Sequence, residues 1–134
     1  MTAARLGREI AANHGPRDEQ TFTLAARDQD GGWIGGINGL IHWRWLYISQ
    51  CYLAPDWRGR GLGRALILEA EAFAREKACV GLYLDTFEAG AMTFYCKCGF
   101  EIAGRIDNFP PNASRTFLSK SLEPDRANGG GAIR

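Results

Sequence analysis

The sequence predicts an α/β protein with one mixed sheet, in which an antiparallel meander of three strands is followed by β-α-β-α-β-β elements. Three observations predict this fold class. Residues 21–27 and 33–42 read as strands on either side of an Asp30-Gly31-Gly32 turn, which is typical of a hairpin. Residues 62–78 carry apolar side chains at helical spacing. Residues 81–86 form a short apolar run, which is typical of a buried parallel strand.

The N-terminal part of the chain supplies a short helix and the meander. Residues 3–13 predict a helix with Leu6 and Ile10 one turn apart, ended by a Gly-Pro pair. The second strand of the hairpin contains three glycines, a composition that is typical of a bulge or a close backbone approach. Residues 46–53 predict the third strand because they are rich in aromatic and β-branched side chains, and Pro55 ends it.

The helix of residues 62–78 is amphipathic, so we expect one of its faces to pack on the sheet. The predicted core stripe consists of Leu62, Leu66, Ala70 and Phe73. The charged side chains of another face are Arg64, Glu71 and Arg75.

The rest of the chain predicts a second helix and two closing strands. Residues 89–98 form the helix, and Gly99 ends it at a left-handed cap position, so that the next aromatic residue folds back onto the helix. The strands at 100–106 and 116–121 are joined by a loop that contains Pro110-Pro111. These elements complete a mixed sheet with antiparallel flanks.

Length, composition and charge limit the kinds of protein that this chain can be. With 134 residues, 46% of them hydrophobic and 23% charged, the chain fits one domain, which we expect over residues 1–122 with a disordered tail at 123–134. A formal net charge of +1 gives no long-range attraction to nucleic acid or to an anionic membrane. No run approaches the roughly 18 apolar residues of a membrane span. The N-terminus lacks the apolar run of a signal peptide, so we expect a cytoplasmic protein with reduced cysteines.

Residues 53–64, LAPDWRGRGLGR, carry the chemistry, since they join the third strand to the first amphipathic helix. Glycines at 59, 61 and 63 allow the backbone to turn its N–H groups toward one point, and the helix N-terminus adds about half a positive charge. The pattern predicts a site for an anion with several oxygens, such as a pyrophosphate. The alternative is a glycine-rich turn with solvated arginines. The spacing matches neither a dinucleotide fingerprint nor a P-loop.

With these residues the chain resembles the GCN5-related N-acetyltransferase (GNAT) superfamily. The family's acyl-CoA motif, Arg/Gln-x-x-Gly-x-Gly/Ala, is matched by residues 58–63, and its preceding hydrophobic-x-Pro is matched by 53–55. A second motif, Ala-x-x-x-Tyr-x-Lys-x-Gly-Phe, is matched by residues 91–100. The resemblance covers roughly residues 22–122. Two separate motifs, each at the expected junction of elements, make it specific.

The resemblance implies an acetyl-CoA-dependent N-acetyltransferase, in which a primary amine of a small molecule or a lysine attacks the thioester directly. Acetyl-CoA would lie in a V where the third strand splays from the next parallel strand. The backbone of Cys51, Tyr52 and Leu53 would bind the pantetheine arm. The residues around the pyrophosphate would be Arg58, Gly59, Arg60, Gly61, Leu62, Gly63 and Arg64. The sequence departs from the family in its short segment before the meander, and in Glu88, where an Asn often contacts the cofactor.

Candidate catalytic residues follow from the same resemblance. Tyr95 is the candidate hydrogen-bond donor to the departing thiolate, and helix packing is the alternative. A tyrosine pKa near 10 lies above a thiol's 8.5, which favours a hydrogen bond over complete proton transfer. Asp85 and Glu88 follow the central strand, where each could be the general base or an ordinary solvated or capping acid. His42, or a water ordered by Ser49 and Tyr47, is a further candidate for the base.

Trp43, Trp45 and Tyr47 cluster at the turn between the second and third strands and are candidates to line the acceptor pocket. With the two acids they would favour a cationic amine, while aromatic packing across the hairpin is the alternative. A non-catalytic CoA-binding regulatory or interaction module also fits the motifs. We expect no metal site, since Cys96 and Cys98 point apart on a helix. A homodimer is expected if the short N-terminus leaves apolar surface for a second copy to cover.

Overall fold

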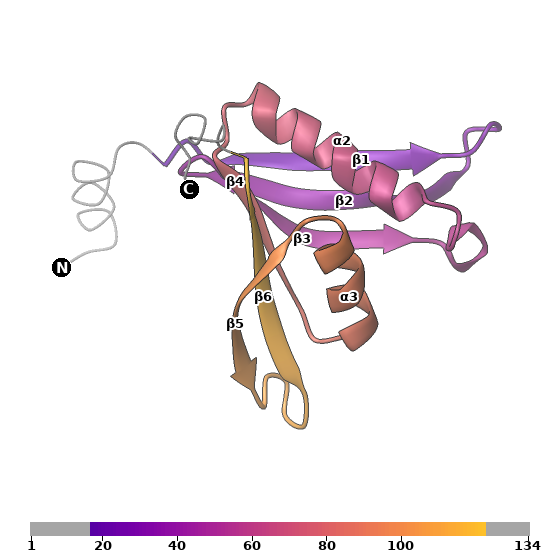
Figure 1. The fold of residues 1–134 in the computed structure, drawn as a ribbon. Helices are drawn as coiled ribbons and strands as arrows, with labels where there is room; N and C mark the ends of the chain where they lie inside the picture. Colours follow the sequence, from indigo (N-terminus) through magenta and orange to yellow (C-terminus); the bar gives the residue numbers. More distant parts are fainter. Residues whose placement is uncertain (1–16, 123–134) are drawn as a thin grey trace.

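A computed structural model describes residues 17–122 of the chain, which form a six-stranded mixed sheet with two α-helices packed on one face (Figure 1). The strand order is β1-β2-β3-β4-β6-β5. The helix predicted at 3–13 and the tail predicted at 123–134 lie outside the described residues. Neither helix of residues 17–122 has the length and apolar character needed to cross a membrane.

The predicted antiparallel meander is present. It consists of β1 (Gln20–Arg27), β2 (Trp33–His42) and β3 (Trp45–Leu53). The carboxylate of Asp28 closes the first turn, because it accepts hydrogen bonds from the N–H groups of Asp30 and Gly32 at 2.9 and 2.8 Å. The glycines of β2 serve a close backbone approach, as the sequence predicts. A Cβ atom at Gly36 would overlap with the carbonyl oxygen of Leu24.

The first amphipathic helix, α2 (Leu62–Glu76), follows a short 3-10 turn at Pro55–Trp57. It ends before the predicted residue 78, because Ala78 adopts a φ of 61°, which an α-helix does not contain. Its buried apolar residues are Leu66, Ile67, Ala70 and Ala74. Glu71, which the sequence places on another face than the apolar stripe, is nevertheless buried. Glu71 is only 8% exposed, and its carboxylate accepts a hydrogen bond from Lys120 Nζ at 2.7 Å.

The second half of the chain completes the sheet. Its elements are β4 (Gly81–Thr86), α3 (Ala89–Lys97), β5 (Glu101–Asp107) and β6 (Ser114–Ser121). Strand β4 lies parallel to β3 and antiparallel to β6. Gly99, at a φ of 97°, ends α3 as predicted, and the ring of Phe100 folds back onto Tyr95 at a centroid distance of 5.8 Å. Lys120 also donates to the carbonyl oxygen of Cys98, so it links the C-terminal half of α2 to the end of α3 on the same face of the sheet.

The two parallel strands separate after four paired residues. Residues Trp45 to Ile48 of β3 pair with Gly81 to Leu84 of β4, and no pairing continues beyond them. At the same point Asn38 pairs with Gln50 and Gly39 with Ile48, so Ser49 is an extra, bulged residue of β3. The remaining residues of β3 diverge from β4. The splayed central strand pair implied by the resemblance is therefore confirmed.

Candidate active site

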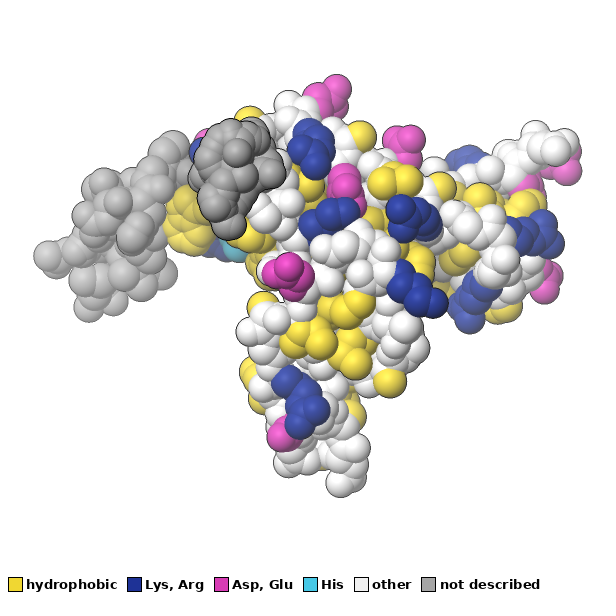
Figure 2. All heavy atoms as spheres, viewed as in Figure 1, with side chains coloured by type: hydrophobic (Ala, Val, Ile, Leu, Met, Phe, Trp, Pro, Cys, Tyr) yellow, Lys and Arg dark blue, Asp and Glu magenta, His cyan; other side chains and the backbone are white. Residues whose placement is uncertain are grey.

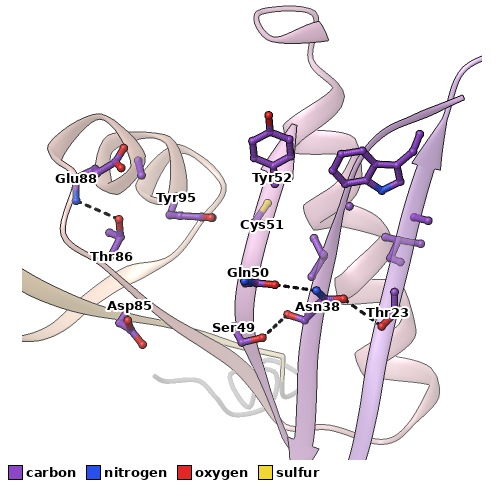
Figure 3. A pocket seen from close by; sticks show the side chains of 16 residues that line it. Thr23, Asn38, Ser49, Gln50, Cys51, Tyr52, Asp85, Thr86, Glu88 and Tyr95 are labelled. Atoms are coloured by element: carbon purple, nitrogen blue, oxygen red, sulfur yellow. Dashed lines mark hydrogen bonds between the residues drawn. The ribbon is translucent and has the colours of Figure 1, made fainter. Parts of the chain in front are cut away.

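A cavity of about 570 Å³ opens where β3 separates from β4. Figure 3 shows the residues of β3 on one side of the gap, and the end of β4 with the start of α3 on the other. The residues that line the cavity are Thr23, Leu24, Ala25, Trp33, Gly36, Ile37, Asn38, Ser49, Gln50, Cys51, Tyr52, Asp85, Thr86, Glu88, Ala91 and Tyr95. Ligand pockets for small molecules commonly measure about 300–1,000 Å³.

The predicted anion site lies at the N-terminus of α2. Gly59 and Gly61 adopt φ values of 77° and 81°, a left-handed conformation that favours glycine. A Cβ atom at either position would meet no heavy atom within 4 Å, so the space above both residues is open. The first hydrogen bond along the helix runs from Ala65 N to Gly61 O at 3.1 Å, and the amides before it point out of the helix end. Such a glycine-rich turn at a helix N-terminus fits a pyrophosphate.

The three arginines of this segment contact protein groups. Arg58 Nε donates to the carbonyl oxygen of Leu53 at 2.7 Å, and the guanidinium of Arg60 lies 4.8 Å from the ring centroid of Trp57. Arg64 Nη1 donates to the last carbonyl of α3 at 3.4 Å. Lys and Arg side chains gather over the end of the molecule where β3 leads into α2 (Figure 2). We infer that the arginines supply positive potential, while the backbone amides supply the direct contacts.

Gly63 has a different role from the other two glycines of the motif. Its φ is not in the left-handed region, and a Cβ atom there would lie 3.2 Å from the ring of Phe94. Phe94 belongs to α3, so this glycine lets the ring of α3 approach the first turn of α2 closely. It serves helix packing, whereas we expected it to help turn the amides toward the anion.

Tyr95 projects from α3 toward Cys51 of β3 (Figure 3). The side chain is 9% exposed. Burial, and next the neighbouring Cys51 thiol, raise the pKa of the Tyr95 hydroxyl well above its ordinary value of 10. Burial also raises the pKa of the Cys51 thiol, while the neighbouring Tyr95 hydroxyl opposes that rise. Tyr95 is therefore a protonated donor at neutral pH, facing the cleft beside a neutral thiol.

Asp85 lines the cavity, as expected, but its carboxylate is engaged. Tyr47 Oη donates to Asp85 Oδ2 at 2.8 Å, and Arg115 Nη1 lies 3.5 Å from Asp85 Oδ1. The Arg115 guanidinium stacks on the ring of Phe109 at 3.9 Å. Burial, followed by the hydrogen bond and the charge of Asp85, raises the pKa of Tyr47 to about 12. Both oxygens of the Asp85 carboxylate therefore already have partners within the protein.

Glu88 also lines the cavity, on the opposite side from β3 (Figure 3). It occupies the N-cap position of α3, but its carboxylate makes no capping hydrogen bond. Its own N–H donates to Thr86 Oγ1 at 3.2 Å. Its exposed carboxylate is thus available to a ligand, which distinguishes it from Asp85.

The three aromatic residues predicted for the acceptor pocket lie elsewhere. Trp45 packs against the backbone of Gly81, Trp43 lies 5.4 Å from the guanidinium of Arg17, and neither lines the cavity. Tyr47 does not line the cavity either, but it donates a hydrogen bond to Asp85, which does. The aromatic side chains that do line it are Trp33, Tyr52 and Tyr95. Sequence reasoning missed Trp33. Regular alternation from Gly36, which pairs with Tyr52, would place Trp33 on the other face of β2, and the register shift between Ala26 and Arg27 brings it next to Tyr52.

In the described part of the chain, no three His, Cys, Asp or Glu side chains lie close enough together to hold a metal ion. His42 Nε2 instead lies 2.8 Å from Tyr83 Oη, away from the cavity lining. Cys96 is exposed and Cys98 buried, in agreement with their opposite directions on α3.

Comparison with known proteins agrees with this geometry. Residues 4–100 match the acetyltransferase (GNAT) family. The blasticidin-S acetyltransferase of Streptomyces morookaense is 34% identical over 107 residues, 79% of each chain. An acetyltransferase from Bacillus cereus has a crystal structure with a TM-score of 0.81 and 27% identity, over 89% of this chain and 85% of that one.

The PaiA N-acetyltransferase of Thermoplasma acidophilum, solved with coenzyme A, shares the fold. Its TM-score is 0.66 at 22% identity, over 85% of this chain and 66% of that chain. The splayed strands, the open glycine turn and these likenesses agree on one assignment. The chain belongs to the GNAT acetyltransferase family and is an acetyl-CoA-dependent N-acetyltransferase.

Proposed function

We propose that the protein acetylates a small cationic primary amine, which Glu88 binds at the mouth of the cleft. The observation that carries this proposal is the charge of the cavity lining. Its ionised side chains are the carboxylates of Asp85 and Glu88, and the lining contains no Lys, Arg or His. Because Arg115 and Tyr47 already engage Asp85, Glu88 is the group left to attract an ammonium ion. The blasticidin-S acetyltransferase is named for a small molecule, which agrees with a cavity of this size.

The chemistry requires loss of a proton from the amine. A lysine-like amine with a pKa of about 10.4 is mostly protonated at pH 7, and its deprotonation costs about 4–5 kcal/mol without help. Glu88 first binds the ammonium group and then accepts its proton, directly or through water. The other carboxylate, held by Arg115 and Tyr47, keeps the end of β4 in place.

The remaining groups act on the acyl donor. The thioester of acetyl-CoA supplies the acetyl group and a thiolate leaving group. The amides at the N-terminus of α2 hold the pyrophosphate, with Gly59 and Gly61 as the left-handed residues of that turn. The bulge at Ser49 leaves backbone N–H and C=O groups out of the sheet ladder beside the cleft. Tyr95 directs a protonated hydroxyl into the same cleft, where it would stabilise the thiolate.

Thiol release from acetyl-CoA on a panel of amines tests this proposal. We expect turnover with cationic primary amines and little with amines that carry a phosphate or carboxylate. Glu88→Gln should raise the KM for cationic amines about 5- to 30-fold, which corresponds to about 1–2 kcal/mol, and should leave the KM for acetyl-CoA unchanged. Because Glu88 is also the base in this proposal, kcat should fall as well and partly recover at higher pH.

Glu101→Gln is the matched control, since Glu101 is an exposed acid of β5 that does not line the cavity. If both variants behave alike on every amine, Glu88 does not bind the acceptor. A preference for anionic amines would contradict the substrate class.

A further inference from the structure

The cavity continues from the cleft onto the outer face of β1, β2 and β3. Its lining on these strands includes Thr23, Asn38 and Gln50, which occupy adjacent positions in the sheet. They are exposed, whereas Phe22 and Ile37 next to them in the chain are buried in the core under α2. This part of the cavity therefore lies on the face of the sheet opposite α2, outside the cleft between β3 and β4.

A row of side-chain hydrogen bonds crosses the three strands there. Thr23 Oγ1 donates to Asn38 Oδ1 at 3.1 Å, and Asn38 Nδ2 donates to Gln50 Oε1 at 2.9 Å (Figure 3). The two bonds hold both amide groups in defined orientations and direct the Gln50 amide nitrogen away from the row. An oriented pair of amides presents donors and acceptors to a flat polar edge at low entropic cost.

Two large aromatic rings border the same surface. Trp33 is 55% exposed and Tyr52 45%, and their rings stack at 5.6 Å with an interplanar angle of 6°. The Arg58 guanidinium lies 5.6 Å from the Tyr52 ring centroid, at the end nearest the predicted pyrophosphate turn. Both rings line the cavity. Exposed, pre-ordered aromatic rings in a concave surface are typical of ligand contacts.

The surface between the rings and the amides is almost bare. Gly36 pairs with Ala25 of β1 on one side and with Tyr52 of β3 on the other. Apart from Tyr52, the only side chain in this row of the sheet is the methyl group of Ala25. The adjacent row is the hydrogen-bonded row of Thr23 and its partners. The backbone at Gly36 therefore forms a floor. The rings of Trp33 and Tyr52 border it on one side, and the amides of Asn38 and Gln50 border it on the other.

We propose that this surface binds the body of the acceptor, and that the acceptor carries its aminomethyl-type amine on a planar aromatic ring with an amide-like polar edge. The ring lies on the floor at Gly36 against Trp33, and its polar edge meets the amides of Asn38 and Gln50. The amine then points toward Glu88 across the cleft. The lining of the cavity contains no Lys, Arg or His that would favour a phosphate on this ring. This inference rests on the proposed acetylation of a small cationic amine.

Three probes that differ in one feature each provide the test. They are 4-(aminomethyl)benzamide, its saturated analogue 4-(aminomethyl)cyclohexanecarboxamide, and 4-methylbenzylamine, which lacks the amide. Dissociation constants are measured by calorimetry on the protein with coenzyme A bound, and KM values by thiol release with acetyl-CoA. We expect the benzamide to bind about 2- to 12-fold more tightly than either analogue, as one aromatic contact or one set of hydrogen bonds would give.

Variants assign each contribution to its residue. Trp33→Leu should weaken binding of the two aromatic probes about 2- to 12-fold and leave the cyclohexane probe and coenzyme A unaffected. Trp33→Phe should restore most of the loss, since it keeps an aromatic face. Gln50→Leu should remove the advantage of the benzamide over 4-methylbenzylamine.

Equal affinities for the three probes, or a Trp33→Leu variant that binds them like wild type, would overturn the inference. Turnover of simple alkylamines under the same conditions would still support the proposed function. Absence of turnover with every cationic amine would instead overturn the proposed function and this inference with it.

Discussion

Gly61→Asp tests the assignment of the anion site, because it changes one position of the glycine turn before α2. Gly61 has a φ of 81°, and open space surrounds its missing Cβ atom. A side chain there meets no steric obstacle in the protein, but its carboxylate enters the space where the pyrophosphate would bind. The variant should fold and should lose affinity for coenzyme A.

The magnitude follows from two separate terms. A left-handed conformation costs a non-glycine residue about 1–2 kcal/mol, which lowers the stability of the free protein. At a hundredfold excess of coenzyme A over its dissociation constant, binding stabilises the wild type by about 2.7 kcal/mol. For a chain of this length that corresponds to a rise in Tm of about 8–11 °C. The free variant should melt lower than wild type, and coenzyme A should raise its Tm hardly at all.

Gly31→Asp is the matched control. Gly31 has a φ of 83° and equally open surroundings, but it lies in the turn between β1 and β2. It should show the same loss of intrinsic stability and keep the full rise in Tm on addition of coenzyme A. Thermal melts with and without coenzyme A measure both quantities. If Gly61→Asp keeps a wild-type rise, the pyrophosphate does not bind at this turn.

Three further predictions concern side chains. Tyr95→Phe should keep the rise in Tm with coenzyme A and lower kcat about 10- to 10⁴-fold, and an unchanged kcat would remove Tyr95 from the mechanism. Because the pKa of Tyr95 is raised, the kcat of the wild type should show no loss from ionisation of Tyr95 up to pH 10. Asp85→Asn should lower the pKa of Tyr47 from about 12 toward 10, since it removes the nearby negative charge; a phenolate titration followed by NMR measures this, and a constant pKa contradicts it. Lys120→Met should reduce the free energy of unfolding by about 3–5 kcal/mol in urea, because it leaves Glu71 buried without its cation, whereas the double variant with Glu71→Leu should recover much of the loss.

Strand and helix assignments could be predicted from the sequence because they depend on neighbouring residues. The alternation in the meander and the glycine turn at Asp30-Gly31-Gly32 place β1 and β2 correctly. The first motif locates the glycine turn before α2, and the second motif with the cap at Gly99 locates Tyr95 near the end of α3. Each of these signals lies within about ten residues of chain, so no long-range information is needed to interpret it.

The roles of charged and aromatic side chains required the tertiary structure. Glu71 has the spacing of a surface acid, yet it is buried because Lys120, from the last strand, reaches it. Likewise Asp85 and Glu88 look alike in the sequence. They differ in the structure because Arg115 of β6 and Tyr47 of β3 engage the carboxylate of the first of them.

What the sequence determined by itself is the set of elements, the family and the glycine turn, since backbone conformation and helical or strand periodicity are properties of short segments. What only the tertiary structure decided is the surface that we propose for the acceptor. The row of Thr23, Asn38 and Gln50 exists because three strands pair in a register that shifts by one residue at Ser49. Register is set by the pairing of whole strands and by the core beneath them, so residues far apart in the chain together decide which side chains face the cleft.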